Sequence, residues 1–280
     1  MDFLKQAWQD FLYNREVILL LGGLYGLISL ILMQPLQNLL EIFYQTGRPE
    51  AADLGLSLTN LIFVVIALAG FLLISAALRV VLARILLRGR ERALDGGINA
   101  LWQRSIWVAI RSLSGGLWAV AFMVPALFVW TIATMASGGD TASPLAGLIL
   151  LPVLIWALVV VSCASAAVNV ATLMHSTDRS FNVTKSWAAL KGKRTDLAGV
   201  ILVISVTVGI AMMIFNGILD IFRVPGWSEA WADAVGEVVG AVVSTILGFV
   251  LLSATARILD STAPGLLVEQ DFEEVLDEEL

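Results

Sequence analysis

The side chains that could do chemistry in this chain are few, and they form no recognised catalytic or metal-binding pattern. There is one His, His175, and one Cys, Cys163, which is too few for a zinc site built from His and Cys. A hydroxyl and a carboxylate follow His175 closely, at Ser176 and Asp178, but neighbours in sequence lack the geometry of a hydrolytic triad. We therefore expect a polar turn there, no enzyme activity, no catalytic residue, no metal and no cofactor.

Uncharged polar side chains within long apolar stretches are the next candidates for functional residues. Asn60, Asn169 and Asn216 lie in or near such stretches. Hydrogen bonding between helices is their usual role, and lining a cavity is the alternative. A proton-coupled transporter would be expected to carry a buried carboxylate, and the centres of these stretches contain no Asp or Glu.

Basic side chains form the third group, because Lys and Arg can bind the phosphates of anionic lipids. Arg79 and Arg84 follow one apolar stretch, from which long side chains can reach the headgroup layer. The candidate headgroup contacts are Arg79, Arg84, Arg88, Arg104, Arg111, Lys191, Lys193 and Arg194. A role as anchors of the membrane topology is the alternative for all of them.

The elements that must position these residues are membrane-spanning helices. Of the 280 residues, 59% are hydrophobic and only 14% are charged, whereas soluble domains carry roughly 25% charged residues. This composition excludes a soluble enzyme, a disordered chain and a nucleic-acid-binding protein. Six apolar stretches reach the length of about 20 residues that a spanning helix needs. They cover about residues 17–33, 56–78, 112–136, 145–174, 197–219 and 238–256. We expect an all-α integral membrane domain over residues 1–260.

The distribution of basic residues predicts the orientation of the spans. Fifteen of the 17 Lys and Arg residues precede the first span, follow the last, or lie between spans two and three or spans four and five. Only Arg48 and Arg223 fall on the other side. By the positive-inside rule both termini are then cytoplasmic, in a bacterial cytoplasmic membrane.

Three amphipathic segments precede successive pairs of spans. They cover about residues 2–15, 93–111 and 180–194. Each carries a Trp, at Trp8, Trp102 and Trp187, beside basic residues suited to the headgroup layer. We predict three repeats of an interfacial elbow helix followed by a helical hairpin. Basic, Trp-containing loops without true repetition are the alternative interpretation.

These elbows also carry a family resemblance. The pattern consists of Ala7-Trp8 before the first span, Arg88-Gly89, the segment Ile98-Asn99-Ala100-Leu101-Trp102, and Arg111 leading into the third span. Over most of its length the chain resembles the bacterial multispan membrane domain that in some proteins precedes glycerophosphoryl diester phosphodiesterase. Because only about twenty residues follow the last span, we expect neither that enzyme domain nor its activity.

Small residues at helical spacing predict where helices approach closely, because close backbone contact is a main source of packing within a membrane. Gly22 and Gly26 lie in the first span. A longer row of small residues recurs every four positions along the sixth span and comprises Ala232, Gly236, Gly240, Ser244 and Gly248. An internal partner helix is favoured over one from a second subunit.

The net charge of −6 belongs to the tail at residues 261–280. Seven acidic residues and no Lys or Arg follow Thr262, so the remainder of the chain is nearly neutral. The tail is interpreted either as a solvated acidic segment or as a docking helix. Such a helix would bind the basic elbows or a basic cytoplasmic protein.

Two functions are consistent with these features. The first is a non-enzymatic protein that contacts anionic lipid headgroups or acts as an accessory scaffold through its elbows. The alternative is a transporter or flippase-like carrier of a small or lipidic molecule. A polar cavity lined by Asn60, Asn169 or Asn216 would favour the carrier, and a dry apolar core would argue against it.

Overall fold

A computed structural model describes residues 2–46, 54–136, 144–177, 183–221, 227–262 and residue 267. Within these ranges the secondary structure is helical and no strand occurs. The helices are α1 (Asp2–Thr46), α2 (Leu54–Arg88), α3 (Gly97–Ala136), α4 (Pro144–Ser176), α5 (Val183–Ala189), α6 (Arg194–Ile221) and α7 (Trp227–Thr262). The docking helix considered for the tail falls on residues 268–280, which lie outside the described ranges.

Six of the described helices are long and apolar enough to cross a membrane, so the chain is a multi-pass membrane protein. Their apolar segments are Phe3–Leu32, Ile62–Arg88, Gly97–Ile132, Pro152–Ser176, Arg194–Leu219 and Ala234–Thr262. The predicted all-α class with six transmembrane helices is confirmed. The second span runs further than expected, because α2 continues to Arg88, about 15 Å beyond residue 78 at the helical rise per residue.

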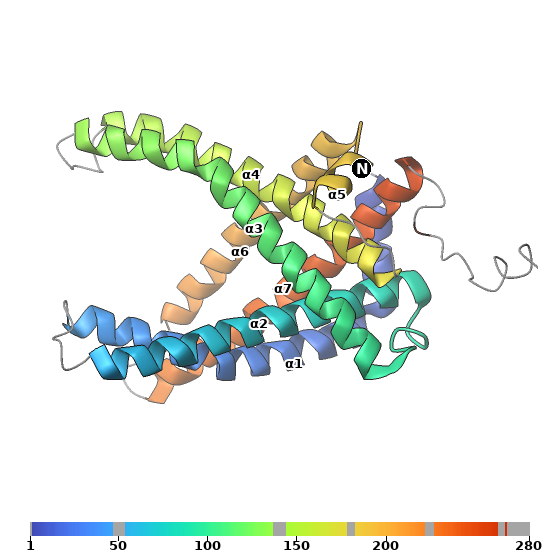
Figure 1. The fold of residues 1–280 in the computed structure, drawn as a ribbon, viewed down its shortest axis with the longest axis horizontal. Coiled ribbons are helices and arrows are strands. Elements are labelled where there is room, and N and C mark those ends of the chain that lie inside the picture. The colour runs from blue at the N-terminus through green and yellow to red at the C-terminus, as the bar shows by residue number, and fades with distance from the viewer. Residues whose placement is uncertain are drawn as a thin grey trace, which may run out of the picture.

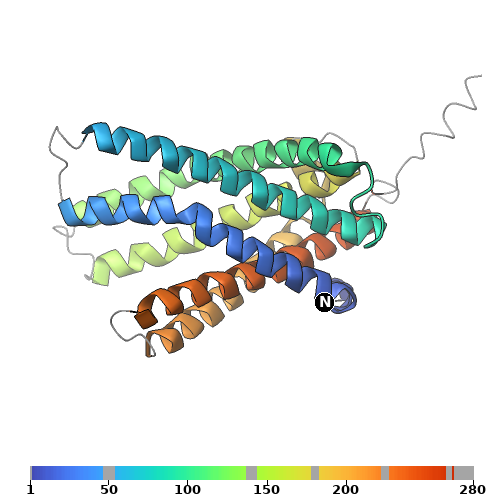
Figure 2. The ribbon, with the colours of Figure 1, turned by 90° about the horizontal axis from the view of Figure 1, so that it is seen from below.

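The six spanning helices form a closed ring in chain order. Each packs on the next, from α1 through α2, α3, α4 and α6 to α7, and the extensive contact between α1 and α7 closes the ring. Figures 1 and 2 show the helices converging at one end and spreading apart as hairpins toward the other. We call the converging end, which holds the N-terminus, the α2–α3 turn, α5 and the end of α7, the terminal end (Figure 1).

The predicted elbow segments differ from one another in the structure. Residues 2–15 are the first turns of α1, and residues 97–111 are the first turns of α3, so both continue directly into a spanning helix. No Gly or Pro that would end a helix before the span occurs in residues 2–15 or in residues 98–111. The third contains a separate helix, α5, and the turn after it includes Gly192 with a φ of 88°. The threefold repeat of the sequence stays a prediction.

The main apolar core lies at the terminal end, where the helices converge. Its largest fully buried members come from five of the spanning helices and include Ile18, Leu82, Leu173, Leu197 and Phe249. Away from this end many large apolar side chains are exposed, as expected for surfaces that face lipid. The terminal end is therefore the tightly packed part of the bundle.

Two glycines mark a close approach of α1 to α7. A Cβ added to Gly22 would lie 3.0 Å from the Cα of Val242, and one added to Gly26 would lie 3.0 Å from the Cα of Val238. Any larger residue would push one backbone away from the other. The partner of these glycines is thus an internal helix.

The row of small residues on α7 does not make that contact. A Cβ on Gly240 would meet only the end of the Met212 side chain, at 3.4 Å, and one on Gly248 would have no atom within 4 Å. The tight packing expected for this row is therefore not observed at these two positions, and Gly236 is half-buried. The α7 residues that face the two α1 glycines lie on a neighbouring face and are Val238, Ala241, Val242 and Thr245.

Candidate functional site

A cavity of about 470 Å³ lies within the ring and is lined by all six spanning helices. Its polar lining residues are Tyr25, Ser75, Arg79, Ser112, Ser165, Asn169, Ser205, Ser244 and Thr245. The apolar lining consists of side chains such as Phe71, Leu72 and Leu251. Arg79 is the one charged member of this described lining, so the cavity carries a positive charge without a carboxylate beside it.

Arg79 reaches the cavity from the membrane-spanning segment Ile62–Arg88 of α2. It lies nine residues before Arg88, the last residue of the helix, which corresponds to about 13 Å along the axis. Its side chain is exposed, and within the described part of the chain it makes no hydrogen bond or ion pair. A charge within a membrane span is costly in lipid, so such charges usually face a cavity and commonly mark a binding site or pathway.

Arg79 and Arg84 were expected at the cytoplasmic end of the second span, and α2 continues past both of them to Arg88. Arg84 is fully buried within the protein and donates from Nη2 to the backbone oxygen of Asp95 at 2.7 Å. The prediction that Arg84 contacts lipid headgroups is therefore wrong, because its guanidinium braces the α2–α3 turn.

Asn169 lines the cavity from α4, as one of the two interpretations of this residue required, and it is buried. Also in the lining, the hydroxyls of Tyr25 and Ser75 lie 2.7 Å apart and link α1 to α2. The side chains of Asn60 in α2 and Asn216 in α6 lie outside the described residues. The cavity lining therefore includes polar groups, at least one of which was singled out from the sequence.

Buried apolar side chains close the cavity toward the terminal end. Leu82, Ile201 and Leu252 line the cavity and also belong to the apolar core, with at most 2% of each side chain exposed. The cavity residues Ser205 and Ser244 lie further from the terminal end along α6 and α7, and both are exposed. The lining residues on the terminal side are accordingly buried, whereas lining residues toward the side where the hairpins spread are exposed.

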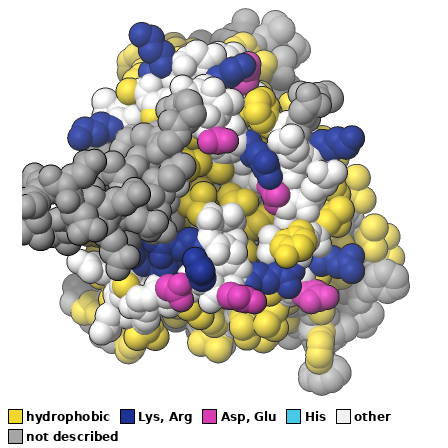
Figure 3. Space-filling model, turned by 90° about the vertical axis from the view of Figure 1, so that its right-hand side faces the viewer, with side chains coloured by type: hydrophobic (Ala, Val, Ile, Leu, Met, Phe, Trp, Pro, Cys, Tyr) yellow, Lys and Arg dark blue, Asp and Glu magenta, His cyan; other side chains and the backbone are white. Residues whose placement is uncertain are grey.

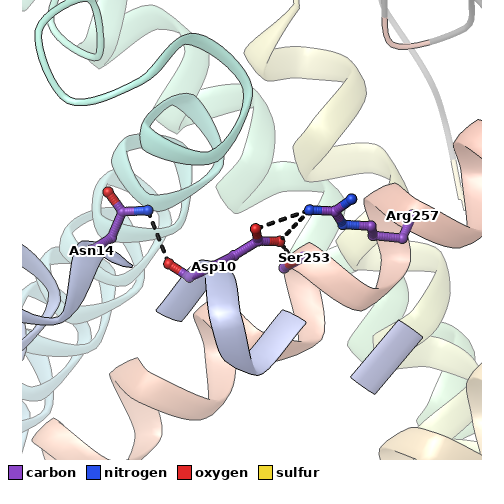
Figure 4. A network of polar contacts seen from close by, with 4 residues as sticks. All are labelled: Asp10, Asn14, Ser253 and Arg257. Carbon is purple, nitrogen blue, oxygen red and sulfur yellow. Dashed lines mark hydrogen bonds and ion pairs between the residues drawn. The ribbon is translucent and has the colours of Figure 1, made fainter. Parts of the chain in front are cut away.

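A polar network joins α1 to α7 at the terminal end, beyond these buried apolar residues (Figure 4). The Asp10 carboxylate accepts two hydrogen bonds from Nη2 of Arg257, at 2.9 and 3.0 Å, and one from the hydroxyl of Ser253 at 2.5 Å. The amide of Asn14 donates to the backbone oxygen of Asp10 at 3.0 Å. Sequence analysis missed this network, because its two sides lie at opposite ends of the chain.

The same network extends to the α2–α3 turn through Arg90. Nε of Arg90 donates to Oδ1 of Asn14 at 3.0 Å, and its Nη2 donates to the backbone oxygen of Tyr13. The guanidinium also lies 5.3 Å from the centre of the Tyr13 ring. Three separate parts of the chain are thus held together at the terminal end.

The remaining basic candidates also lie at the terminal end, where Lys, Arg and acidic side chains are interspersed (Figure 3). Arg111 lies 5.6 Å from the ring centre of Trp107, and Arg194 lies 5.0 Å from that of Trp187. Lys193 pairs with Asp196 at 3.3 Å. Arg88 and Arg104 are half-buried, and Lys191 is exposed. Their contact with lipid headgroups stays a prediction.

Comparison with protein-family models, curated proteins and solved structures gives no match for this chain. The resemblance to the bacterial membrane-domain family therefore stays a prediction. In the described ranges, no three His, Cys, Asp or Glu side chains gather closely enough to hold a metal ion. The features of the described residues that bear on function are accordingly the cavity and its single arginine.

Proposed function

We propose that this protein is a carrier that binds a small or lipidic anion in the central cavity, with a phosphate or carboxylate group at Arg79. The observation that supports this proposal is the exposed Arg79 side chain in a cavity lined by all six spanning helices. Of the two functions consistent with the sequence, the carrier is the one that uses such a cavity. The scaffold function needs only the basic surface.

The chemistry of Arg79 favours an anion. A guanidinium presents five donors in a planar fork and binds phosphate or carboxylate through two parallel hydrogen bonds. The effective dielectric constant between packed helices is lower than that of water, so a bound anion gains more from the pairing in the cavity than it would in water. The hydroxyl and amide groups around it can hydrogen-bond the remaining oxygens of the ligand.

The buried apolar residues on the terminal side of the cavity agree with the function of a carrier. Carriers expose a central site to one side of the membrane at a time, while packed helices close the other side. Here the leucine and isoleucine side chains that close the cavity rest on the apolar core, and the Asp10 network lies beyond them. Release toward the terminal end would require α1 and α7 to move apart there.

Replacing Arg79 by Gln is expected to weaken the binding of anions at least tenfold, because the amide cannot supply the charge of the guanidinium. Binding is measured on the purified chain in detergent by native mass spectrometry with anionic lipid and by thermal shift with inorganic phosphate or succinate. Arg92→Gln is the matched control, since Arg92 is exposed in the α2–α3 turn. Equal binding of every anion by wild type and Arg79→Gln would refute the carrier proposal.

The proposed setting is a bacterial cytoplasmic membrane with the terminal end in the cytoplasm, where its basic side chains face anionic lipids. In a variant lacking Cys163, we expect single cysteines at Glu91 and Lys191 to react with an impermeant thiol reagent only in inverted vesicles. A cysteine at Met135, which is exposed near the opposite end, should react only in right-side-out vesicles. The reverse pattern would contradict this orientation.

A further inference from the structure

The cavity lining contains a group of serines whose hydrogen bonding differs from that of other hydroxyls in the spans. Elsewhere, Ser162 donates to the backbone oxygen of Leu158 at 2.7 Å and Thr172 donates to that of Val168 at 2.8 Å. Such bonds to the preceding turn are the usual way to satisfy a hydroxyl in a membrane helix. They leave few hydroxyls available to a ligand.

The cavity serines make no such bond. In the described ranges, Ser112, Ser165, Ser205 and Ser244 form no hydrogen bond, although all four line the cavity with Arg79. They come from α3, α4, α6 and α7, so they surround the cavity on several sides. Each hydroxyl can donate one hydrogen bond and accept two. The lining therefore offers one positive charge and several neutral donors and acceptors.

We propose that the ligand is a phospholipid with one negative charge and an uncharged, hydroxyl-bearing headgroup, of the phosphatidylglycerol class. This inference rests on the carrier function proposed above and identifies its substrate class. The phosphodiester would pair with Arg79, and the headgroup hydroxyls would bind the cavity serines. Because the described lining contains no Asp or Glu, a zwitterionic headgroup would place its ammonium near Arg79 without a carboxylate to pair with it.

The volume of the cavity agrees with the size of a lipid headgroup rather than with that of a whole lipid. A volume of about 470 Å³ is within the range of about 300–1,000 Å³ typical of small-molecule sites. The acyl chains would extend from the cavity between the hairpins, which spread apart away from the terminal end (Figures 1 and 2). Apolar side chains are exposed along this part of the helices, for example Leu117 and Phe128 of α3. A lipid would therefore place its polar and apolar parts against matching surfaces.

The test compares lipid classes on the full chain in detergent. Phosphatidylglycerol, phosphatidic acid, phosphatidylethanolamine and phosphatidylcholine are titrated separately and read by native mass spectrometry, with soluble glycerol phosphate as competitor. We expect phosphatidylglycerol to bind at least tenfold more tightly than either zwitterionic lipid and more tightly than phosphatidic acid. Glycerol phosphate should compete only at far higher concentration. Equal binding of all four lipids, or equally strong competition by glycerol phosphate, would overturn the inference.

Serine variants separate this inference from the carrier proposal. Ser112→Ala combined with Ser165→Ala should reduce the preference for phosphatidylglycerol over phosphatidic acid at least threefold, while Ser162→Ala, the matched control outside the cavity, should leave it unchanged. If Arg79→Gln abolishes anion binding but the double serine variant keeps the full preference, the headgroup assignment is wrong and the carrier proposal stands. If Arg79→Gln binds anionic lipid like the wild type, the carrier proposal itself fails.

Discussion

Replacing Gly26 by Val is expected to destabilise the protein by about 1–3 kcal/mol, the range for overpacking a close contact. A Cβ at this position would lie 3.0 Å from the Cα of Val238 and 3.1 Å from the Cβ of Ala241. Both atoms are held by the α7 backbone and cannot rotate away as the end of a long side chain can. The two γ-methyl groups of Val would therefore force α1 and α7 apart. The unfolding temperature of the purified protein in detergent reports the effect.

Gly23→Val is the matched control for this variant. Gly23 lies three positions earlier on the same helix, and a Cβ there would have no atom within 4 Å. Both substitutions replace a helical glycine by the same β-branched residue, so their effects on intrinsic helix propensity are equal. The unfolding temperature of Gly23→Val should stay close to that of the wild type. A drop equal to that of Gly26→Val would contradict the close approach of α1 and α7.

Replacing Asp10 by Ala is expected to destabilise the protein by about 2–3 kcal/mol, because hydrogen bonds to charged groups contribute about 1.5–3 kcal/mol. The variant loses three hydrogen bonds that join α1 to α7. It also leaves the fully buried hydroxyl of Ser253 without its acceptor, which adds a desolvation cost. Chemical denaturation in mixed micelles measures the loss.

Asp196→Ala tests whether this effect belongs to the network or to any lost ion pair. Asp196 pairs with Lys193 at 3.3 Å, but 61% and 41% of the two side chains are exposed. Exposed pairs contribute little, so we expect a change within about 0.5 kcal/mol. A double-mutant cycle between Asp10→Ala and Arg257→Met should then give a coupling energy above about 1 kcal/mol. Additive effects in that cycle would mean that the Asp10–Arg257 contact stabilises nothing.

The two stability predictions bear on function because they concern the same pair of helices. The glycines hold α1 against α7 in the middle of the bundle, and Asp10 holds them at the terminal end. The cavity takes Tyr25 from α1 and Ser244 from α7. Variants that separate α1 from α7 should therefore also alter ligand binding, and they serve as structural controls for the Arg79 variant.

Local sequence features predicted the spans better than the elbows. Hydropathy identified all six spanning helices, because each must cover the bilayer by itself. The separation of the first two elbows from their spans was not found, since nothing in residues 2–15 or 97–111 interrupts a helix. The absence of Gly and Pro from residues 2–15 and 98–111 is a signal that could have shown the continuity. The third segment contains Gly192, and there a separate helix occurs.

The sequence by itself determined that this chain is an all-helical membrane protein with six spans, because solvation by a bilayer acts on each apolar stretch independently. The tertiary structure decided which residues meet. Asp10 and Arg257 are 247 positions apart, and Arg79 acquires its setting from six helices that contribute one face each to the cavity. Hydropathy specifies that a helix lies in the membrane, but the face it turns toward its neighbours depends on how all the helices pack. For that reason the sequence alone did not show that Arg79 lines the central cavity.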